Sequence, residues 1–514
     1  MFACADRVLA DGGASRYAAG MPARNAASAL ALLFVACAAD AAAAPNVVLI
    51  YTDDQRADTL SAYGNTEIRT PNLDRLAGEG FNFRRNYCMG AYNGAVCVPS
   101  RAMLLTGRQL FNVSEKLNED EPLMPRVFSD AGYDTFMTGK WHNGYGPDAV
   151  RAITRAFDNG AAIYLGGMAN HLQVPLVDLV DGSVENRRIG DGYSTDLFEQ
   201  AAIDFLNSRA ESDTAEQKPF FLYVATTAPH DPRQPPEGYG DRFADAPPSL
   251  PPNFLPQHEF DNGSLVLRDE NLAAWPRDPD VVREQLGQYY AMIEHLDAAI
   301  GRIVETARRV GGEDTIIVYA ADHGLALGSH GLLGKQSVYE HSLRSPMIFA
   351  GPSVVSGETN ELTYLYDIFP TLCSLCGVEA PNGVDGLSLA PLLEGESIAG
   401  RDAILLTHKA NQKAIVEQDW KLIRYPKVDH TQLFHLASDA HETTNLADDP
   451  AHADRVRAML ARLQVLQAAV GDESPLTVES PKPLRRDLTG TPRKADQWQP
   501  QWIVDRYFEA DEQD

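Results

Sequence analysis

Five short apolar runs occur in the first 350 residues of the chain, and helical patterns lie between them. Runs of this length without polar alternation are typical of strands that are buried on both faces of a sheet. We expect such strands at 46–51, 134–139, 220–225, 315–321 and 347–350. The clearest helical pattern covers 283–309, where the apolar side chains fall on one stripe. Strands that alternate with helices predict a layered α/β domain.

The pattern of apolar and polar residues changes near residue 395. Residues 403–408, 413–425 and 432–436 predict short strands of a small antiparallel sheet, and an amphipathic helix is expected at 453–468. The tail that follows is polar and carries prolines, so we expect it to wrap the surface or to be partly mobile. The predicted organisation is a signal region at 1–41, a main domain at 42–395, a C-terminal subdomain at 396–470 and a tail at 471–514.

The first 41 residues predict an export signal that begins late. Residues 1–20 are polar and rich in glycine. From Met21 onward the regions follow one another as in a signal peptide: a positively charged residue, Arg24, then an apolar run, then a small-residue cleavage site ending at Ala41. We therefore expect translation to start at Met21 and the protein to be periplasmic or secreted. A lipoprotein attached through Cys37 is an alternative, although a bulky phenylalanine stands three positions earlier.

The composition narrows the class of protein. Of the 514 residues, 44% are hydrophobic and 22% are charged, which is ordinary for a soluble globular protein. Outside the leader no apolar run reaches the roughly 18 residues of a membrane helix. The formal net charge of −27, with no basic tract, argues against nucleic acid as a partner. An anionic substrate would therefore need a local basic pocket.

The cysteines that follow the leader are too few for a disulfide scaffold in a chain of this length. Cys373 and Cys376 lie in an apolar stretch of helical spacing without further metal-ligand partners, so we interpret both as small buried residues.

Chemically active side chains follow four of the predicted strands. Ligands of open α/β sheets bind beyond the carboxyl ends of the strands. A pair of aspartates is often a turn or a helix cap, and a single histidine is often only a hydrogen-bonded polar residue. Four strand ends that supply almost only carboxylates, imidazoles and ammonium groups favour an active site instead. These residues are Asp53, Asp54, Lys140, His142, His230, Asp322 and His323, with Lys335 further along the chain.

These groups suit two kinds of ligand. Three aspartates without a thiolate suit a hard divalent cation, Ca²⁺ or Mg²⁺. Lys140 and Lys335, with imidazoles nearby, suit a tetrahedral oxyanion. The cation would neutralise charge on the oxyanion and orient it for displacement. An enzyme that displaces a group from such an oxyanion also needs a nucleophile, which these residues do not supply.

The segment Cys97–Arg101 reads CVPSR and leads into a predicted helix, whose start favours negative charge. This motif resembles the signature of type I sulfatases. Further segments match the family: YTDDQ (51–55), GKWH (139–142), TAPH (227–230), ADHG (321–324) and GLLGKQSVYEHSLR (331–344). The resemblance extends from about residue 46 to residue 446. It implies an alkaline-phosphatase-like fold, with a large mixed sheet between helices, and makes 42–395 the catalytic domain.

The resemblance also implies roles for individual residues. In this family a maturation enzyme oxidises the motif cysteine to Cα-formylglycine; one hydroxyl of its hydrate attacks sulfur, and the other then releases sulfate. The implied ligands of Ca²⁺, or of Mg²⁺, are Asp53, Asp54, Asp322, His323 and the modified Cys97. Arg101 and Lys140 would hold the hydrate and the sulfate, and His142 would act as the base. His230 or Lys335 would protonate the leaving alcohol.

The substrate is predicted from the rim of the site. The segments PHDPRQ (229–234) and YEHSLR (339–344) look more like the corresponding segments of sulfatases that act on sugars and on choline sulfate than like those of aryl sulfatases. With the proline-rich 231–257 and with 165–195 they would form the rim. Candidate substrate contacts are Asp231, Arg233, Gln234, His341 and Arg344.

We expect an exported sulfatase of mono-, oligo- or polysaccharides. Three alternatives stay open. One is a phosphonate monoester or phosphodiester hydrolase of the same fold, and another is a choline-sulfate-type sulfatase. The third is a non-catalytic carbohydrate-binding relative.

Overall fold

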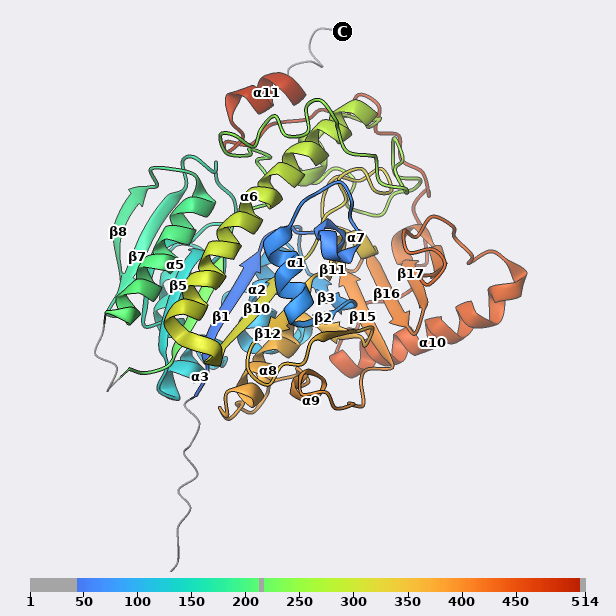
Figure 1. The fold of residues 1–514 in the computed structure, drawn as a ribbon. Coiled ribbons are helices and arrows are strands. Elements are labelled where there is room, and N and C mark those ends of the chain that lie inside the picture. Colours follow the sequence, from blue (N-terminus) through green and yellow to red (C-terminus); the bar gives the residue numbers. More distant parts are fainter. Residues whose placement is uncertain (1–43, 212–216, 509–514) are drawn as a thin grey trace, which may run out of the picture. The chain divides into compact units, whose positions relative to one another are not determined.

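A ten-stranded mixed β-sheet forms the centre of the molecule (Figure 1). The structure is a computed structural model, and it describes residues 44–211 and 217–508. The strand order is β13-β2-β12-β10-β1-β9-β5-β6-β7-β8. All five strands predicted in this domain are present and end within one residue of the expected positions. They are β1 (Asn46–Thr52), β5 (Asp134–Lys140), β9 (Phe220–Ala225), β10 (Thr315–Ala321) and β12 (Met347–Ala350).

The middle of the sheet is parallel and its edges are not. Strands β10, β1, β9, β5 and β6 (Asn159–Tyr164) run parallel, whereas β12 is antiparallel to β10. At the other edge β7 (Pro175–Val180) and β8 (Ser183–Ile189) form an antiparallel hairpin. Short strands β2 (Phe81–Phe83) and β13 (Gly357–Thr359) complete the sheet. Much of 165–195, expected as binding-site rim, is thus an edge of the central sheet.

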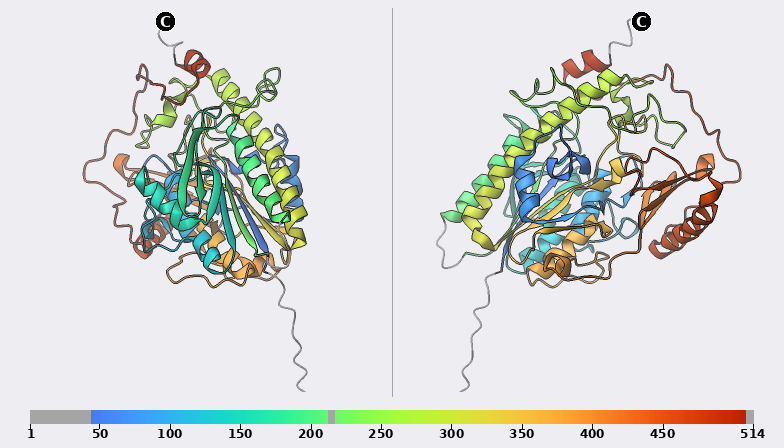
Figure 2. Two further views of the ribbon diagram at one scale, coloured as in Figure 1. Left: turned by 90° about the vertical axis from the view of Figure 1, so that its left-hand side faces the viewer. Right: turned by 45° about the vertical axis from the view of Figure 1, so that its right-hand side comes forward.

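Alternate residues of the central strands pack against two different helix layers. Val48 and Ile50 of β1 belong to an apolar cluster with α1, α5 and α6, and Val47 and Leu49 belong to a cluster with the helices of the opposite face. Figure 2 shows α5 and α6 side by side along the first face. The helices of the first face are α1 (Pro71–Glu79), α5 (Ser194–Ala210) and α6 (Pro279–Gly311), and those of the second are α2 (Cys97–Thr106), α3 (Met124–Asp130), α4 (Pro147–Ala156) and α8 (Ile368–Leu375). The predicted mixed sheet between helices is confirmed.

Helix α6 extends the predicted 283–309 at both ends, because its start is capped. The Asp278 carboxylate accepts hydrogen bonds from the backbone N–H groups of Asp280 and Val281, and Pro279 stands at the first helical position.

The C-terminal residues form the expected small sheet and helix. Strands β15 (Ala403–His408), β16 (Gln412–Glu417), β17 (Trp420–Tyr425) and β18 (His430–His435) are antiparallel, and α10 (Ala453–Val470) follows. A fifth strand, β4 (Gly90–Ala91), joins this sheet from the segment that leads to Cys97. Gly90 has a φ of 126°, and a Cβ there would lie 1.7 Å from the carbonyl oxygen of Thr407. Only glycine permits this approach, which ties the second sheet to the loop before Cys97.

The remaining elements are short. They are β3 (Asn86–Tyr87), β11 (Arg344–Ser345), β14 (Thr363–Tyr364), α7 (Glu340–Leu343), α9 (Ala390–Leu393) and α11 (Gln501–Tyr507). The tail runs along the outside of the molecule and ends in α11 beside the start of α6 (Figure 2), where Arg506 pairs with Glu284 at 2.9 Å.

Among residues 44–211 and 217–508, no helix combines the length and apolarity that a membrane span requires. The predicted leader, with Met21 and Cys37, lies outside the described residues.

Candidate active site

The carboxyl ends of β1 and β10 bring the two predicted carboxylate groups together. These strands are parallel neighbours, and Thr52 pairs with Ala321, so Asp53 and Asp322 emerge side by side. The Asp322 Oδ1 atom accepts hydrogen bonds from the backbone N–H of Asp54 at 3.0 Å and of His323 at 2.9 Å. Its Oδ2 atom accepts none, although it is buried. Asp322 therefore presents one fixed oxygen and one free oxygen.

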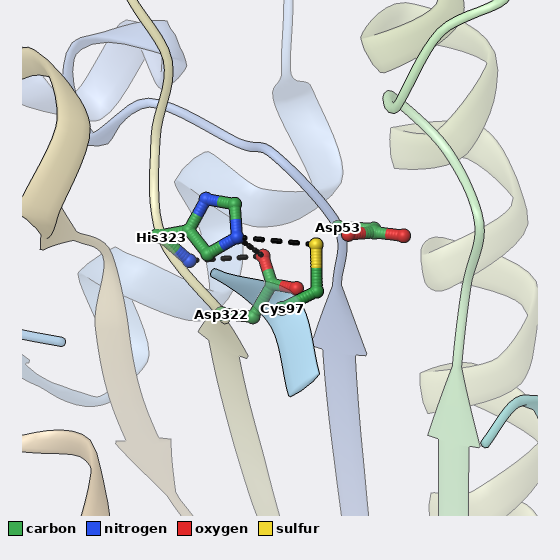
Figure 3. A group of neighbouring side chains, drawn as sticks. All are labelled: Asp53, Cys97, Asp322 and His323. Atoms are coloured by element: carbon green, nitrogen blue, oxygen red, sulfur yellow. Dashed lines mark hydrogen bonds and ion pairs between the residues drawn. The ribbon is translucent and has the colours of Figure 1, made fainter. Parts of the chain in front are cut away.

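Cys97 is the first residue of α2 and faces this group (Figure 3). Its Sγ atom lies 3.3 Å from His323 Nε2, 3.3 Å from Lys335 Nζ and 3.9 Å from Asp54 Oδ1. The Ser100 hydroxyl donates to the backbone carbonyl of Asp322 at 2.8 Å, which holds the first turn of α2 against the end of β10. Helix and strand ends thus meet at the thiol.

The donor atoms around Cys97 suit a hard divalent cation. Ligand atoms of Asp53, Cys97, Asp322 and His323 all lie within 4.8 Å of one another, and so do those of Asp53, Asp54, Cys97 and His230. The Asp53 Oδ1 atom, like Asp322 Oδ2, is buried without a hydrogen-bond partner. His323 Nδ1 lies 2.9 Å from the carbonyl oxygen of Gly324, to which it donates, so its Nε2 carries the lone pair and faces Cys97 Sγ at 3.3 Å. Oxygen donors with one imidazole fit the predicted cation.

Three buried cations surround the carboxylates. Lys140 forms an ion pair with Asp53, Lys335 pairs with Asp54 at 2.7 Å, and Arg101 Nη2 lies 3.6 Å from Asp322 Oδ2. Arg101 also donates from Nη1 to the carbonyl oxygen of Lys140 at 3.0 Å, while its Nε and Nη2 have no hydrogen-bond partner. These donors form the local basic pocket that an anionic substrate requires in a protein of net charge −27.

The two strand-end carboxylates differ in proton affinity. Burial raises the pKa of Asp53, but the positive charges of Lys140, His230 and Arg101 outweigh it and hold that pKa well below its usual value. Burial and the negative charge of Asp53 raise the pKa of Asp322 well above its usual value. A bound cation would relieve this repulsion, because it favours the ionised form of both groups.

Cys97 is not a reactive thiolate in this setting. Burial and the charge of Asp53 raise the pKa of the thiol well above its usual value, despite the two lysines. The side chain is only 1% exposed. The thiol is thus protonated at neutral pH and is a poor nucleophile in its own right.

The two predicted acid–base histidines are buried at the same site. Burial, reinforced by the positive charge of Lys140, lowers the pKa of His142 well below 6.5, so its ring is neutral at neutral pH. His142 has a φ of 58°, and its Nδ1 atom has no partner. His230 Nδ1 donates to the carbonyl oxygen of Asp231 at 2.7 Å, and its Nε2 lies 3.7 Å from Asp54 Oδ2.

Gly167 lies in 165–195, the segment predicted as rim, but its contact with His142 was not predicted. A Cβ at this position would lie 2.2 Å from Nε2 of His142, so any side chain larger than hydrogen would displace the ring. Gly167 and its neighbour Gly166 are followed by no recognisable motif, and only the fold shows that this turn lies against the catalytic candidate.

The predicted rim residues divide into two groups. Arg233 Nη1 donates to Gln285 Oε1 at 3.1 Å, and the buried Arg233 Nε and Gln234 Oε1 have no partner. Both residues continue the chain from His230 and stay near the site. His341 instead stacks on Tyr339 and His330, and the guanidinium of Arg344 pairs with Glu340 at 3.0 Å.

Arg344 lines a separate pocket with Arg84, Arg85 and Asp419. The YEHSLR segment includes α7 and packs against Gly324, β3 and the C-terminal sheet. The side chains of His341 and Arg344 thus have protein partners, and their role as substrate contacts stays a prediction.

Asp231 has protein partners in place of a free carboxylate. It forms a two-point ion pair with Arg268, and Gln499 Nε2 donates to its Oδ2 at 2.9 Å. Arg268 also pairs with Asp496 at 2.6 Å. The tail thus reaches the residue that follows His230. No sequence signal could have shown this, because the partners are more than 200 residues apart.

Comparisons with known proteins agree with this geometry. Residues 45–378 match the sulfatase family, and residues 328–469 match the C-terminal region of N-sulphoglucosamine sulphohydrolase. An N-acetylglucosamine-6-O-sulfatase of Bacteroides thetaiotaomicron is 26% identical over 508 residues, covering 84% of this chain and 88% of the relative. An arylsulfatase of Clostridium perfringens is 30% identical over 454 residues, covering 80% of this chain and 92% of the relative.

A solved structure shares the fold. It is that of a protein in complex with its substrate D-glucosamine-2-N,6-O-disulfate, with a TM-score of 0.70 and 24% identity over 85% of this chain and all of the other. The family match covers well over half of the chain. The chain therefore belongs to the sulfatase family, with its alkaline-phosphatase-like fold, and is an enzyme that hydrolyses sulfate esters.

Proposed function

We propose that this enzyme removes sulfate from sulfated carbohydrates, through a formylglycine formed from Cys97 and a bound Ca²⁺ or Mg²⁺ ion. The observation that carries the proposal is the position of Cys97. The thiol stands where free oxygens of two aspartates, one imidazole and two lysines meet, yet burial leaves it protonated and unreactive. A precursor that is later oxidised explains both facts.

The described residues supply a fitting cation site. Asp53 Oδ1 and Asp322 Oδ2 accept no hydrogen bond from the described residues, and Asp54 and His323 Nε2 complete the donors beside residue 97. When bound, the cation withdraws charge from the sulfate oxygens and aligns sulfur with the attacking group. Ca²⁺ is the better match, because oxygen donors predominate and it tolerates irregular geometry.

The surrounding side chains then have separate tasks. Arg101 orients the oxygens of residue 97 through its two unpartnered nitrogens, and Lys140 and Lys335 neutralise the sulfate. His142, neutral because of its burial, accepts the proton when the second hydroxyl of the hydrate releases sulfate. His230, fixed through Nδ1, presents Nε2 to the bridging oxygen and protonates the leaving alcohol.

Maturation must precede folding of this region. Cys97 is 1% exposed and every residue of α2 is buried, so a second enzyme cannot reach the thiol in the folded chain. A formylglycine-generating enzyme would therefore act on the unfolded segment. The leader pattern supports export as part of the same proposal.

A carbohydrate substrate is supported by the rim and by the relatives. Arg233 and Gln234 carry buried nitrogen and oxygen atoms without protein partners, which suit the hydroxyl groups of a sugar. One relative is named for N-acetylglucosamine 6-sulfate, and another is named for aryl sulfates. Similarity alone therefore does not distinguish the two classes, and the polar atoms of the rim support a sugar.

The test is a panel of substrates with the purified, matured enzyme. We expect sulfated mono- and oligosaccharides to have higher kcat/KM than a simple aryl sulfate, choline sulfate or a phosphonate monoester. Faster turnover of the aryl sulfate than of every sugar would contradict the carbohydrate assignment. Preference for the phosphonate would favour the hydrolase alternative, and preference for choline sulfate would favour a choline sulfatase.

A further inference from the structure

A cleft of about 810 Å³ opens at Gln234, four residues after His230 of the sulfate pocket. Its walls come from four regions: the loop that holds Leu172, the proline-rich loop, the first turns of α6 and helix α11 of the tail. The side chains that matter for its chemistry are Leu172, Gln234, Phe243, Arg283, Glu284 and Trp502.

Gln234 connects the cleft to the sulfate pocket. It lies four residues after His230 and directly follows Arg233, whose Nη1 donates to Gln285 Oε1 of α6 at 3.1 Å. Gln234 is 8% exposed, and its Oε1 atom has no hydrogen-bond partner within the described parts of the chain. A buried amide oxygen without a partner is costly unless a ligand donates to it. The cleft therefore offers a hydrogen-bond acceptor next to the group that holds sulfate.

The tail adds an aromatic wall to the cleft. Trp502 is 42% exposed and Leu172 is 51% exposed, so two large apolar side chains face solvent at this one place. Trp502 is held by α11, which is fastened to α6 through the Arg506–Glu284 ion pair and a hydrogen bond from Gln288 to the Tyr507 hydroxyl at 3.1 Å. An indole on a rigid support can stack against the apolar C–H face of a sugar ring. The tail lies beyond both matched family regions, which end at residue 469.

The charge of the lining distinguishes between kinds of sugar. The carboxylates of Glu237, Asp241 and Glu284 line the cleft, and that of Glu284 is paired with Arg506 at 2.9 Å. The one cation among the lining residues is Arg283. That cation is already paired with Asp280 at 2.9 Å. Carboxylates accept hydrogen bonds from hydroxyl groups, but they repel a second sulfate or a uronate.

We propose that this cleft is a subsite for a neutral sugar linked to the sulfated sugar, with Trp502 as its stacking platform. The inference rests on the proposed carbohydrate specificity and refines it: the preferred substrate is an oligosaccharide in which a sulfated unit adjoins an uncharged one. The volume of the cleft and its two buried amide oxygens without a hydrogen-bond partner, those of Gln234 and Gln288, suit one or two sugar rings and not a densely sulfated chain.

The experiment compares two substrates with the matured full-length enzyme. The first is the sulfated monosaccharide that the panel shows to be turned over fastest. The second is the same unit extended by one neutral sugar, prepared in both linkage directions. We expect kcat/KM to be about tenfold higher for one of the extended substrates, and Trp502→Ala to remove most of that advantage while leaving the monosaccharide within about twofold. Trp502→Phe should keep most of the advantage.

Two controls isolate the contribution of the subsite. Leu484→Ala changes a tail side chain of similar exposure, 40%, that does not line the cleft, and it should leave both substrates unchanged. Extension by a uronic acid should give less advantage than extension by a neutral sugar. Equal kcat/KM for the monosaccharide and both extended substrates, or equal losses on all of them in Trp502→Ala, would overturn the subsite. Turnover of aryl sulfate but of no sugar would instead contradict the proposed function itself.

Discussion

The sulfate pocket and the rim that surrounds it are built in different ways. Most charged groups of the pocket lie at the ends of central strands or in the first half of α2, Lys335 lies in the loop after β10, and ion pairs and backbone N–H groups fix many of their atoms. The rim is assembled from a proline-rich loop, one end of α6 and the tail, with segments far apart in the sequence. The pocket contacts the sulfate group that all substrates share, whereas the rim contacts the part of the substrate that differs from one sulfate ester to another.

This difference predicts that substitutions in the pocket and substitutions in the rim affect different sets of substrates. Changes in the pocket should lower turnover of every sulfate ester, because all substrates share the sulfate group. Changes in the rim should act only on substrates that reach the rim. The ratio of kcat/KM for a sugar sulfate to that for an aryl sulfate separates the two regions.

The largest effect is expected for Cys97→Ser. Serine has nearly the same volume but cannot become the aldehyde hydrate, so turnover of all substrates should fall by about a thousandfold or more while the thermal midpoint changes little. Steady-state kinetics and a thermal melt measure the two quantities. Cys373→Ser is a matched control, since Cys373 is also 1% exposed but lies in α8, and it should keep activity. Near-normal activity of Cys97→Ser would refute the role of residue 97.

Removal of the cation should have the next largest effect. Chelation, or Asp322→Ala, should lower kcat for sugar and aryl sulfates alike by about a hundredfold or more, because the enzyme then lacks the cation that orients the sulfate group. A second measurement does not depend on turnover: added Ca²⁺ should raise the thermal midpoint of the wild type but not that of Asp322→Ala. A variant that is still stabilised by Ca²⁺ would show that Asp322 is not a ligand.

The sequence was enough to predict that several pocket residues lie close together, because their positions depend only on where each strand ends. Asp53, Lys140 and Asp322 stand directly at the ends of apolar runs, and parallel neighbours must place those ends at one edge. Sequence reasoning did not anticipate the protein partners of His341 and Arg344, which contact Tyr339 and Glu340, because these contacts depend on the turn that α7 makes. The small sheet and α10 were predicted, but the insertion of β4 into that sheet was not, since two residues carry no periodic signal.

Two arginines predicted from sequence as substrate contacts offer an intermediate test. Arg233→Ala should lower kcat/KM for the sugar sulfate by about tenfold, as expected when a charge-assisted hydrogen bond is lost, and should change the aryl sulfate by less than about twofold. Arg344→Ala is the matched control, because the structure places that side chain in another pocket. Equal losses on both substrates in Arg233→Ala would assign Arg233 to the sulfate pocket.

The smallest effect concerns the contact between tail and pocket. Asp496→Asn weakens one partner of Arg268, which holds Asp231 beside His230. We expect kcat to fall by about two- to fivefold on both substrates, because the loosened residue positions an acid that all substrates use. Kinetics with both substrates check this. A loss confined to the sugar sulfate would place the Asp496–Arg268 pair with the rim.

The identity of residue 97 in the native enzyme is the central claim. Mass spectrometry of the tryptic peptide 86–101, from protein purified from its own host, tests it most directly. We predict a peptide that has lost H₂S and gained one oxygen relative to the encoded sequence, in proportion to the activity of the preparation. A fully active preparation in which this peptide carries an unmodified cysteine would contradict the formylglycine mechanism.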